Sequence, residues 1–224
     1  MKKILLIHNK YRQLGGEDIS FENELQFLTR HFEVDNLVFN NNKITPNDVV
    51  SFFTNRNKSS LKILDKKIEK FSPDVAYIHN TWFKGSLGIF DKLKDKNVEI
   101  ILKLHNLRFY CTKSFFSSQH FKGDEICYSC GKKRESMGLL NKYYDNSNLK
   151  SFFVSRYGRK YFQIIKDYDI KLLVLSELHK KFLFDLGIDE NKIFIFPNYI
   201  KKQNENLEIK KIKERNKVLY AGRI

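Results

Sequence analysis

Residues 2–18, KKILLIHNKYRQLGGED, decide the fold of this chain. The apolar run Ile4–Ile7 is long enough for one buried strand, and the polar pair His8–Asn9 is expected to end it. The glycine pair Gly15–Gly16 follows, and the apolar positions of 21–28 then recur at the spacing of one helix face. The stretch therefore predicts a strand, a glycine-rich loop and a helix.

The pair Gly15 and Gly16 has two interpretations. Glycine lacks a Cβ, so the backbone can take a positive φ and let a ligand approach closely. The free N–H groups at the start of the following helix would then suit a phosphate or a carboxylate. The alternative is a plain tight turn. The full G-x-G-x-x-G fingerprint is absent, which argues against an NAD site.

The rest of the chain repeats the alternation of short apolar strands and helices. Strands are expected at 32–39, 75–78, 98–104, 171–175, 193–196 and 217–221. Helices are expected at 45–53, 63–71, 85–94, 149–169 and 177–186, the last one ending at Gly187. This order predicts the α/β class, with a Rossmann-like parallel sheet that has helices on both faces.

Polar pairs follow the predicted strands. Three of them are His-Asn pairs: His8–Asn9, His79–Asn80 and His105–Asn106. Ser176 and Asn198 follow two later strands. A single histidine of this kind is usually structural, but the carboxyl ends of parallel strands share one edge, where such sheets bind ligands. Imidazole and amide groups at that edge suit hydroxyls and phosphates.

The composition limits the class of protein. The 224 residues fit one large domain, or one domain and part of another. The net charge of +15 indicates an anionic partner or, equally, a lysine-rich composition of the whole chain. No run of about 18 apolar residues exists that could span a membrane. The apolar run at the start is too short for a signal peptide, so we expect a cytoplasmic protein.

The three cysteines lie in an irregular insert at about 108–145. Their odd number argues against a disulfide framework. With one histidine they form the pattern C-x8-H-x6-C-x2-C, which is made by Cys111, His120, Cys127 and Cys130. This spacing is compatible with a structural zinc site, but a single C-x2-C pair favours reduced thiols. A catalytic cysteine is disfavoured because no cysteine lies at a predicted strand end.

Six segments, taken in order, resemble a GT-B glycosyltransferase of the retaining family 4 type. They are ILLIHNKYRQLGGED, PDVAYIHN, LKLHNLRFYC, VLSELHKKFLFDLGI, IFPNYI and VLYAGRI. The resemblance covers almost the whole chain. It implies that residues 1–200 are the N-terminal, acceptor-side domain, that 201–216 are an interdomain linker, and that 217–224 begin the second domain. The rest of that donor-binding domain is missing, so we expect a fragment that is inactive alone.

The resemblance also implies roles for individual residues. His105 resembles the active-site histidine near the donor sugar and the acceptor hydroxyl. Arg223 resembles the arginine that contacts the donor diphosphate. The residues that resemble the substrate-binding set are Gly15, Gly16, His79, Asn80, Asn106, Ser176 and Asn198. The implied reaction transfers a sugar from a UDP- or GDP-linked donor with retained configuration, and it needs no metal. Cationic groups and helix N-termini would stabilise the leaving diphosphate.

The implied acceptor is a glycan or a lipid-linked glycan of cell-surface polysaccharide synthesis. Basic and aromatic residues of Leu149–Asp169 (Arg156, Arg159 and Lys160 beside Phe152 and Tyr157) predict contact with the anionic inner face of a membrane, or else a solvated surface. A non-catalytic sugar- or nucleotide-binding module is the alternative function. Nucleic-acid binding is disfavoured, because the polar residues gather at strand ends and form no basic stripe.

Overall fold

The computed structural model describes residues 1–10, 15–42, 45–107, 142, 144 and 146–199. These residues form a six-stranded sheet in the order β2-β1-β3-β4-β5-β6, and every neighbouring pair is parallel. The strands are β1 (Lys3–Lys10), β2 (Glu33–Asn40), β3 (Val75–Ile78), β4 (Glu99–Leu104), β5 (Ile170–Val174) and β6 (Ile193–Ile195). The predicted α/β class with a Rossmann-like parallel sheet is confirmed.

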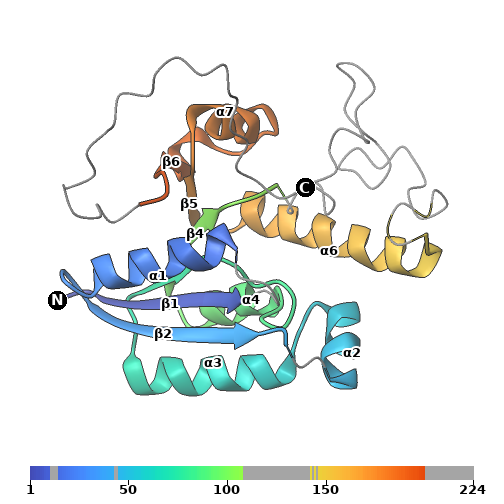
Figure 1. Cartoon of the computed structure of the whole chain (residues 1–224), viewed down its shortest axis with the longest axis horizontal. Coiled ribbons are helices and arrows are strands. Elements are labelled where there is room, and N and C mark those ends of the chain that lie inside the picture. The colour runs from blue at the N-terminus through green and yellow to red at the C-terminus, as the bar shows by residue number, and fades with distance from the viewer. Residues whose placement is uncertain (11–14, 43–44, 108–141, 143, 145, 200–224) are drawn as a thin grey trace, which may run out of the picture.

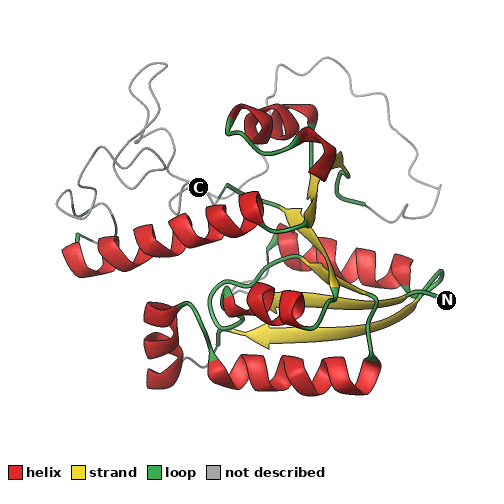
Figure 2. Cartoon of the chain, turned by 180° about the vertical axis from the view of Figure 1, so that it is seen from behind, coloured by secondary structure: helices red, strands yellow, loops and turns green. Residues whose placement is uncertain are grey.

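Helices connect the strands. They are α1 (Gly16–Leu28), α2 (Pro46–Thr54), α3 (Lys58–Phe71), α4 (Gly88–Asp95), α6 (Asn148–Asp167) and α7 (Glu177–Asp185), with a 3₁₀ turn η2 (Glu190–Lys192) before β6. Figure 1 shows α1 and α3 on opposite sides of β1 and β2. Figure 2 shows the same layers from behind, with the strands between the helices. The predicted cover of both sheet faces is therefore present.

Two apolar clusters hold these layers together. On one face Phe21 of α1 packs with Leu6 and Tyr77 of the sheet. The other face carries the larger cluster, to which α3, α4, α6 and α7 contribute, among others, Leu64, Phe90, Ile165 and Leu183. Central strands that are buried on both faces need apolar residues at nearly every position, which explains why β3 reads Val-Ala-Tyr-Ile without alternation.

Local signals place most element ends. Thr45 caps α2 by accepting a hydrogen bond from Asp48 N–H, and Pro46 occupies the first turn, as the sequence predicted. Asn55 takes a left-handed φ of 56° after α2, and the Asn57 side chain then caps α3. Gly187 ends the α7 region with a φ of 80°, as expected for a glycine after a helix.

The end of β1 differs from the prediction. His8 and Asn9 do not end this strand; they lie within it, paired with Val38 and Phe39 of β2, and both are fully buried. The pairing with β2 continues to Lys10, so the ladder keeps these polar residues in the strand. The element boundaries at 85–94 and 171–175 also shift, to Gly88–Asp95 and Ile170–Val174.

The order in which successive strands are added to the sheet reverses between β1 and β3, while all strands stay parallel. From β1 the chain moves outward to β2, then returns and continues in the other direction through β3 to β6. The carboxyl edge at such a reversal is where open α/β sheets hold their ligands. The predicted linker at 201–216 and the segment 217–224 lie outside the described residues, as does nearly all of the predicted insert.

Candidate functional site

Three histidines meet at the carboxyl edge of the sheet. His8 lies near the end of β1, His79 follows β3, and His105 follows β4. His79 Nδ1 lies 3.1 Å from His105 Nε2, and the two rings stack with their centroids 5.2 Å apart. The His8 ring meets the edge of His79 at 6.2 Å. The predicted convergence of the strand-end histidines is therefore present, because β1, β3 and β4 are neighbours in the sheet.

The side chains of Asn9 and Asn80 form hydrogen bonds with backbone groups near the site. Asn9 Oδ1 accepts a hydrogen bond from Gly85 N–H at 2.9 Å. Asn80 donates to the Asn9 carbonyl at 3.1 Å and accepts from Trp82 N–H at 2.9 Å. A Cβ at Gly85 would lie 3.0 Å from the Thr81 carbonyl oxygen, so this tight turn requires glycine. Asn80, predicted to line the substrate cleft, is buried, and both ends of its amide bond to the backbone.

Asn106 links the end of β4 to the start of α1. Its Nδ2 donates to Glu17 Oε1 at 2.6 Å. Both residues are partly exposed, so this pair lies at the surface of the site, beside His105 in the chain. The pair offers a carboxylate and an amide to a ligand at the histidine edge.

The glycine pair lies at the start of α1 in ordinary backbone conformations. Gly15 caps α1 with an extended φ of −132°, and Gly16 is the first helical residue. Neither glycine therefore takes the positive φ that a glycine permits. Among the described residues, a Cβ at Gly16 would meet no atom within 4 Å, so none of these neighbours requires glycine there. Both glycines lie at the helix N-terminus, as the sequence predicted.

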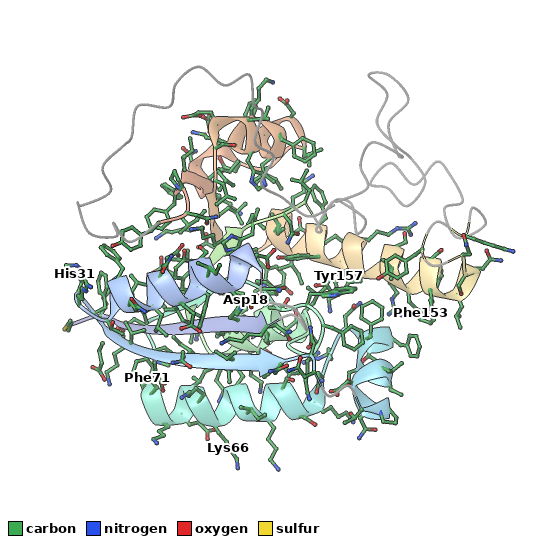
Figure 3. The ribbon with its side chains drawn as sticks, viewed as in Figure 1. Asp18, His31, Lys66, Phe71, Phe153 and Tyr157 are labelled. Atoms are coloured by element: carbon green, nitrogen blue, oxygen red, sulfur yellow. The ribbon has the colours of Figure 1, made fainter. Side chains whose placement is uncertain are left out.

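Asp18 fixes the loop to the sheet. One carboxylate oxygen accepts from Gly15 N–H at 2.8 Å, and the other lies 2.9 Å from His8 Nε2. Figure 3 shows Asp18 beneath the start of α1. The first turn of α1 thus carries two acidic residues, Glu17 and Asp18, which already stabilise the positive end of the helix dipole. A ligand phosphate at this point would meet these negative charges.

A buried ion pair lies behind the histidines. Lys103 of β4 is 1% exposed and donates to Oε1 of Glu24, an α1 residue that is 2% exposed. Ser20 also donates to Oε1, at 2.9 Å, and the Tyr77 hydroxyl donates to Oε2. His79 Nε2 lies 3.5 Å from the same Oε2.

The sequence interpretation missed this group of residues. One signal was available: Lys103 interrupts the apolar strand EIILKL, and a lysine in a strand that is buried on both faces must find an anionic partner. The sequence did not identify Glu24 as that partner.

Burial keeps the three imidazoles neutral. It lowers the pKa of His105 to about 3, with help from the charges of Lys103, His8 and His179. It lowers the pKa of His79 well below the ordinary value. The pKa of His8 is also lowered by burial, although Asp18 opposes this shift. At neutral pH each ring can donate one hydrogen bond and accept one.

The predicted residues Ser176 and Asn198 follow β5 and β6, further along the sheet edge from the three histidines. Ser176 caps α7 by accepting a hydrogen bond from His179 N–H. Asn198 Oδ1 lies 3.0 Å from Ser20 Oγ, which brings the segment after β6 against α1. Within the described ranges, neither residue is hydrogen bonded to the three histidines. The first turn of α7 is close enough for the charge of His179 to lower the pKa of His105, a neighbour that the sequence did not identify.

Several predicted residues lie outside the described part of the chain. They are Cys111, His120, Cys127, Cys130 and Arg223. The zinc site and the diphosphate contact therefore stay predictions. In the described part, no group of three histidine, cysteine or acidic residues is placed to hold a metal ion.

A cavity of about 220 Å³ opens on the α1 face of the sheet. Its lining residues are Ile4, Glu24, Phe27, Leu28, Phe32, Val75, Tyr77, Ile101, Leu173 and Phe196. The walls are almost wholly apolar, so this cavity lacks groups that recognise a nucleotide or a sugar. The histidine edge is the candidate site.

One residue of the helix predicted to contact a membrane, Tyr157 of α6, is buried instead. Tyr157 is 2% exposed and packs against Trp82 at 4.7 Å between ring centroids, so it is a core residue and not a membrane contact. In Figure 3 it lies on the side of α6 that faces the fold. Phe153 instead packs on Phe53 of α2 at 4.1 Å, and Arg156 donates to the Phe53 carbonyl at 3.1 Å. No helix in the described residues is long and apolar enough to cross a membrane.

The sequence matches no family model. It also matches no protein among the curated sequences. Among solved structures, the chain is similar to UDP-N-acetylglucosamine 2-epimerase from Rickettsia bellii, with 13% identity and a TM-score of 0.48. The similar region covers 88% of this chain and 45% of the epimerase chain, so this chain spans less than half the length of that relative.

Proposed function

We propose that residues 1–200 are the acceptor-side domain of a GT-B glycosyltransferase of the retaining family 4 type. It would transfer a sugar from a UDP- or GDP-linked donor to a glycan or lipid-linked acceptor in cell-surface polysaccharide synthesis, on the cytoplasmic side of the membrane. The observation that carries this proposal is the cluster of neutral histidines at the carboxyl edge, with His105 stacked on His79 at 5.2 Å.

The chemistry of this edge favours sugar hydroxyls over phosphates. A hydroxyl can donate to one partner and accept from another, which fits neutral imidazoles, an amide and a carboxylate. Glu17 and Asp18 would repel a phosphate at the start of α1. We therefore assign the acceptor sugar to His105, Asn106 and the Gly15–Gly16 loop.

His105 would act as a hydrogen-bonding group. A pKa of about 3 keeps the ring neutral at pH 7 but makes it a weak base. Its proposed role is to orient an acceptor hydroxyl, while the negative charge of the leaving diphosphate is stabilised by Arg223 and by the donor-side domain. The transfer in this proposal uses no metal; the zinc site predicted at Cys111–Cys130 would be structural.

The surface formed by α2 and α6 would place the enzyme at an anionic membrane. Its exposed apolar residues are Val49 and Val50 of α2 and Leu149 and Phe152 of α6. The sequence of α6 holds five basic residues and one acidic residue, Asp167 at its end. Apolar side chains flanked by basic residues are typical of interfacial helices. A lipid-linked acceptor would then reach the carboxyl edge from this side.

Acceptor binding tests the proposal. We expect methyl glycosides of glucose, galactose, mannose or N-acetylglucosamine to show saturation-transfer NMR signals with this chain. His105→Ala should weaken the bound glycoside about ten-fold, the cost of about one hydrogen bond to a ligand. His31→Ala is the matched control, because His31 is exposed at the opposite end of α1 (Figure 3). If the His105 and His31 variants bind the glycoside equally well, the assignment of the acceptor sugar to His105 is contradicted.

Two results would favour the alternative functions. A non-catalytic binding module would bind the sugar, yet a chain that also carries a donor-side domain would release no nucleotide diphosphate from a nucleotide sugar. A nucleic-acid-binding protein would retard labelled DNA in a manner that weakens steeply with salt.

A further inference from the structure

Glu24 begins a chain of hydrogen-bonding groups that reaches the proposed sugar site. Its two carboxylate oxygens accept hydrogen bonds from three donors: Lys103, Ser20 and Tyr77. A carboxylate paired with an ammonium group has only lone pairs to offer. Any further polar atom that faces Glu24 must therefore bring a proton.

His79 is the group that faces Glu24. Its Nε2 is buried 3.5 Å from Glu24 Oε2, and its Nδ1 points the other way, toward His105. Burial, together with the nearby charges, lowers the pKa of His79 well below normal, so the ring is neutral and carries one proton. That proton belongs on Nε2, because a bare Nε2 would set its lone pair against the carboxylate. His79 Nδ1 is then a hydrogen-bond acceptor.

His105 completes the chain. It can bond to a bare Nδ1 of His79 only by donating its own Nε2–H, across 3.1 Å. His105 is neutral at pH 7, so this is its one ring proton. Its Nδ1 is left with a lone pair, and within the described residues its side chain has no hydrogen bond other than that to His79.

We propose that Glu24 and His79 are positioning residues that hold His105 as the Nε2–H tautomer, with Nδ1 presented as a hydrogen-bond acceptor. The proposal rests on the proposed function for its ligand. Such a His105 accepts a hydrogen bond from a sugar hydroxyl and repels a group that has only lone pairs, such as a phosphate oxygen. The histidine edge would thus select an uncharged, hydroxyl-bearing ring.

The direction of the bond between His105 and His79 can be measured directly. In the full chain labelled with ¹⁵N-histidine, the single proton between the rings is attached either to His105 Nε2 or to His79 Nδ1. Proton–nitrogen correlation NMR at pH 7, with coupling across the hydrogen bond, identifies which nitrogen carries it. Single histidine variants assign the signals. We expect the proton on His105 Nε2; a proton on His79 Nδ1 would overturn the proposal.

A paired substitution tests the role of Glu24. Glu24→Met with Lys103→Met removes both charges together, so neither is left buried alone. Without the carboxylate, both directions of the bond should be populated, and the His105 Nε2–H signal should lose a large part of its intensity. An unchanged direction in this variant would exclude Glu24 as the cause.

Matched variants separate this effect from a general disturbance. Tyr77→Phe removes one donor to Glu24 but keeps the ion pair, so the direction should stay as in the wild type. Glu22→Gln alters a partly exposed α1 residue whose partner is Lys10, and should also leave the direction of the bond unchanged. These measurements need no ligand, so a chain that fails to bind methyl glycosides would contradict the proposed function while the bond direction still decides this inference.

Discussion

Lys103 shows how one buried charge organises the site at the scale of single residues. Burying an ammonium group is costly unless an anion and further hydrogen bonds compensate it. Glu24 supplies the anion, and Ser20 and Tyr77 each occupy one further lone pair of its carboxylate. Removal of one partner from such a pair typically costs about 3–5 kcal/mol. The pair therefore fixes α1 against β4, and with it the groups that surround His79.

The buried histidines make stability depend on pH. In the unfolded chain a histidine takes up a proton below about pH 6.5, whereas folded His105 resists protonation down to about pH 3. The unfolded state binds more protons in this window, so the free energy of unfolding decreases as the pH falls from about 6.5 toward 3. His105 alone should contribute a loss of about 2 kcal/mol between pH 7 and 5. Urea unfolding at several pH values measures it.

A variant assigns this pH dependence to the site. His105→Gln should flatten the stability curve between pH 7 and 5, because glutamine does not titrate. His31→Gln, at an exposed position, should leave the curve as it is. A curve that keeps its slope in the His105 variant would contradict the lowered pKa.

At the scale of elements, the glycine at the start of α1 and the glycine after α7 have different backbone conformations. Gly187 takes a φ of 80° beyond α7, where an alanine is strained even though no atom lies within 4 Å of its Cβ. Gly16 opens α1 with helical geometry and equally open space. The fold therefore explains Gly187, and the proposed ligand would explain Gly16.

Alanine substitutions test this contrast. Gly187→Ala should destabilise the chain by about 1 kcal/mol, the usual cost of a left-handed conformation for a residue with a Cβ. Gly16→Ala should leave stability unchanged or raise it by about 0.5 kcal/mol, because alanine is the better helix former. Thermal unfolding measures both. If a sugar approaches the loop, Gly16→Ala should also weaken methyl glycoside binding; unchanged binding would remove the loop from the site.

The surface formed by α2 and α6 is predicted to bind anionic vesicles. Sedimentation with vesicles that contain anionic phosphatidylglycerol should retain the wild-type chain, and neutral phosphatidylcholine vesicles should retain far less. Arg159→Glu should weaken binding about ten-fold or more, since each basic residue near such a surface contributes about 1 kcal/mol and the variant reverses a charge. Phe152→Ser should weaken it through the loss of apolar contact.

A charge reversal elsewhere controls for net charge. Lys66→Glu changes the charge by the same amount at an exposed position in the middle of α3, away from α2 and α6 (Figure 3). It should weaken vesicle binding much less than Arg159→Glu. Equal effects of the two variants would mean that the overall charge of +15, and not this surface, attracts the lipid.

At the scale of the whole molecule, the described residues form one half of the proposed reaction site. The histidine edge offers groups for an acceptor, while the residue predicted to contact the diphosphate, Arg223, lies outside the described part. The acidic first turn of α1 further disfavours phosphate binding there. We therefore expect the nucleotide to need a second domain.

Nucleotide affinity tests this division. Calorimetry should show that UDP, GDP and their sugars bind the 224-residue chain with Kd values no tighter than about 1 mM, equivalent to about −4 kcal/mol. A chain that also carries a complete donor-side domain should bind them substantially more tightly. Tight binding by the 224-residue chain would place the nucleotide on the Gly15–Gly16 loop and would favour the binding-module alternative.

The sequence by itself determined the order of the elements and the edge at which polar side chains gather. Apolar runs such as Ile4–Ile7 and Val75–Ile78 are local signals, and a strand that is buried on both faces needs them. The three His-Asn pairs could be placed at one edge because parallel strands all end on the same side.

The roles of these polar residues depend on contacts that form in the folded chain. Glu24 and Lys103 are 79 positions apart in the chain, and no local pattern encodes such a contact. Asn80 has the same sequence context as Asn106, yet one bonds to the backbone of a turn and the other to Glu17. Tyr157, grouped with the membrane-contacting residues in the sequence interpretation, is instead buried with Tyr161 and Ile165 on the inner face of α6. Burial and pairing across the chain set these outcomes, since both depend on neighbours that are distant in sequence.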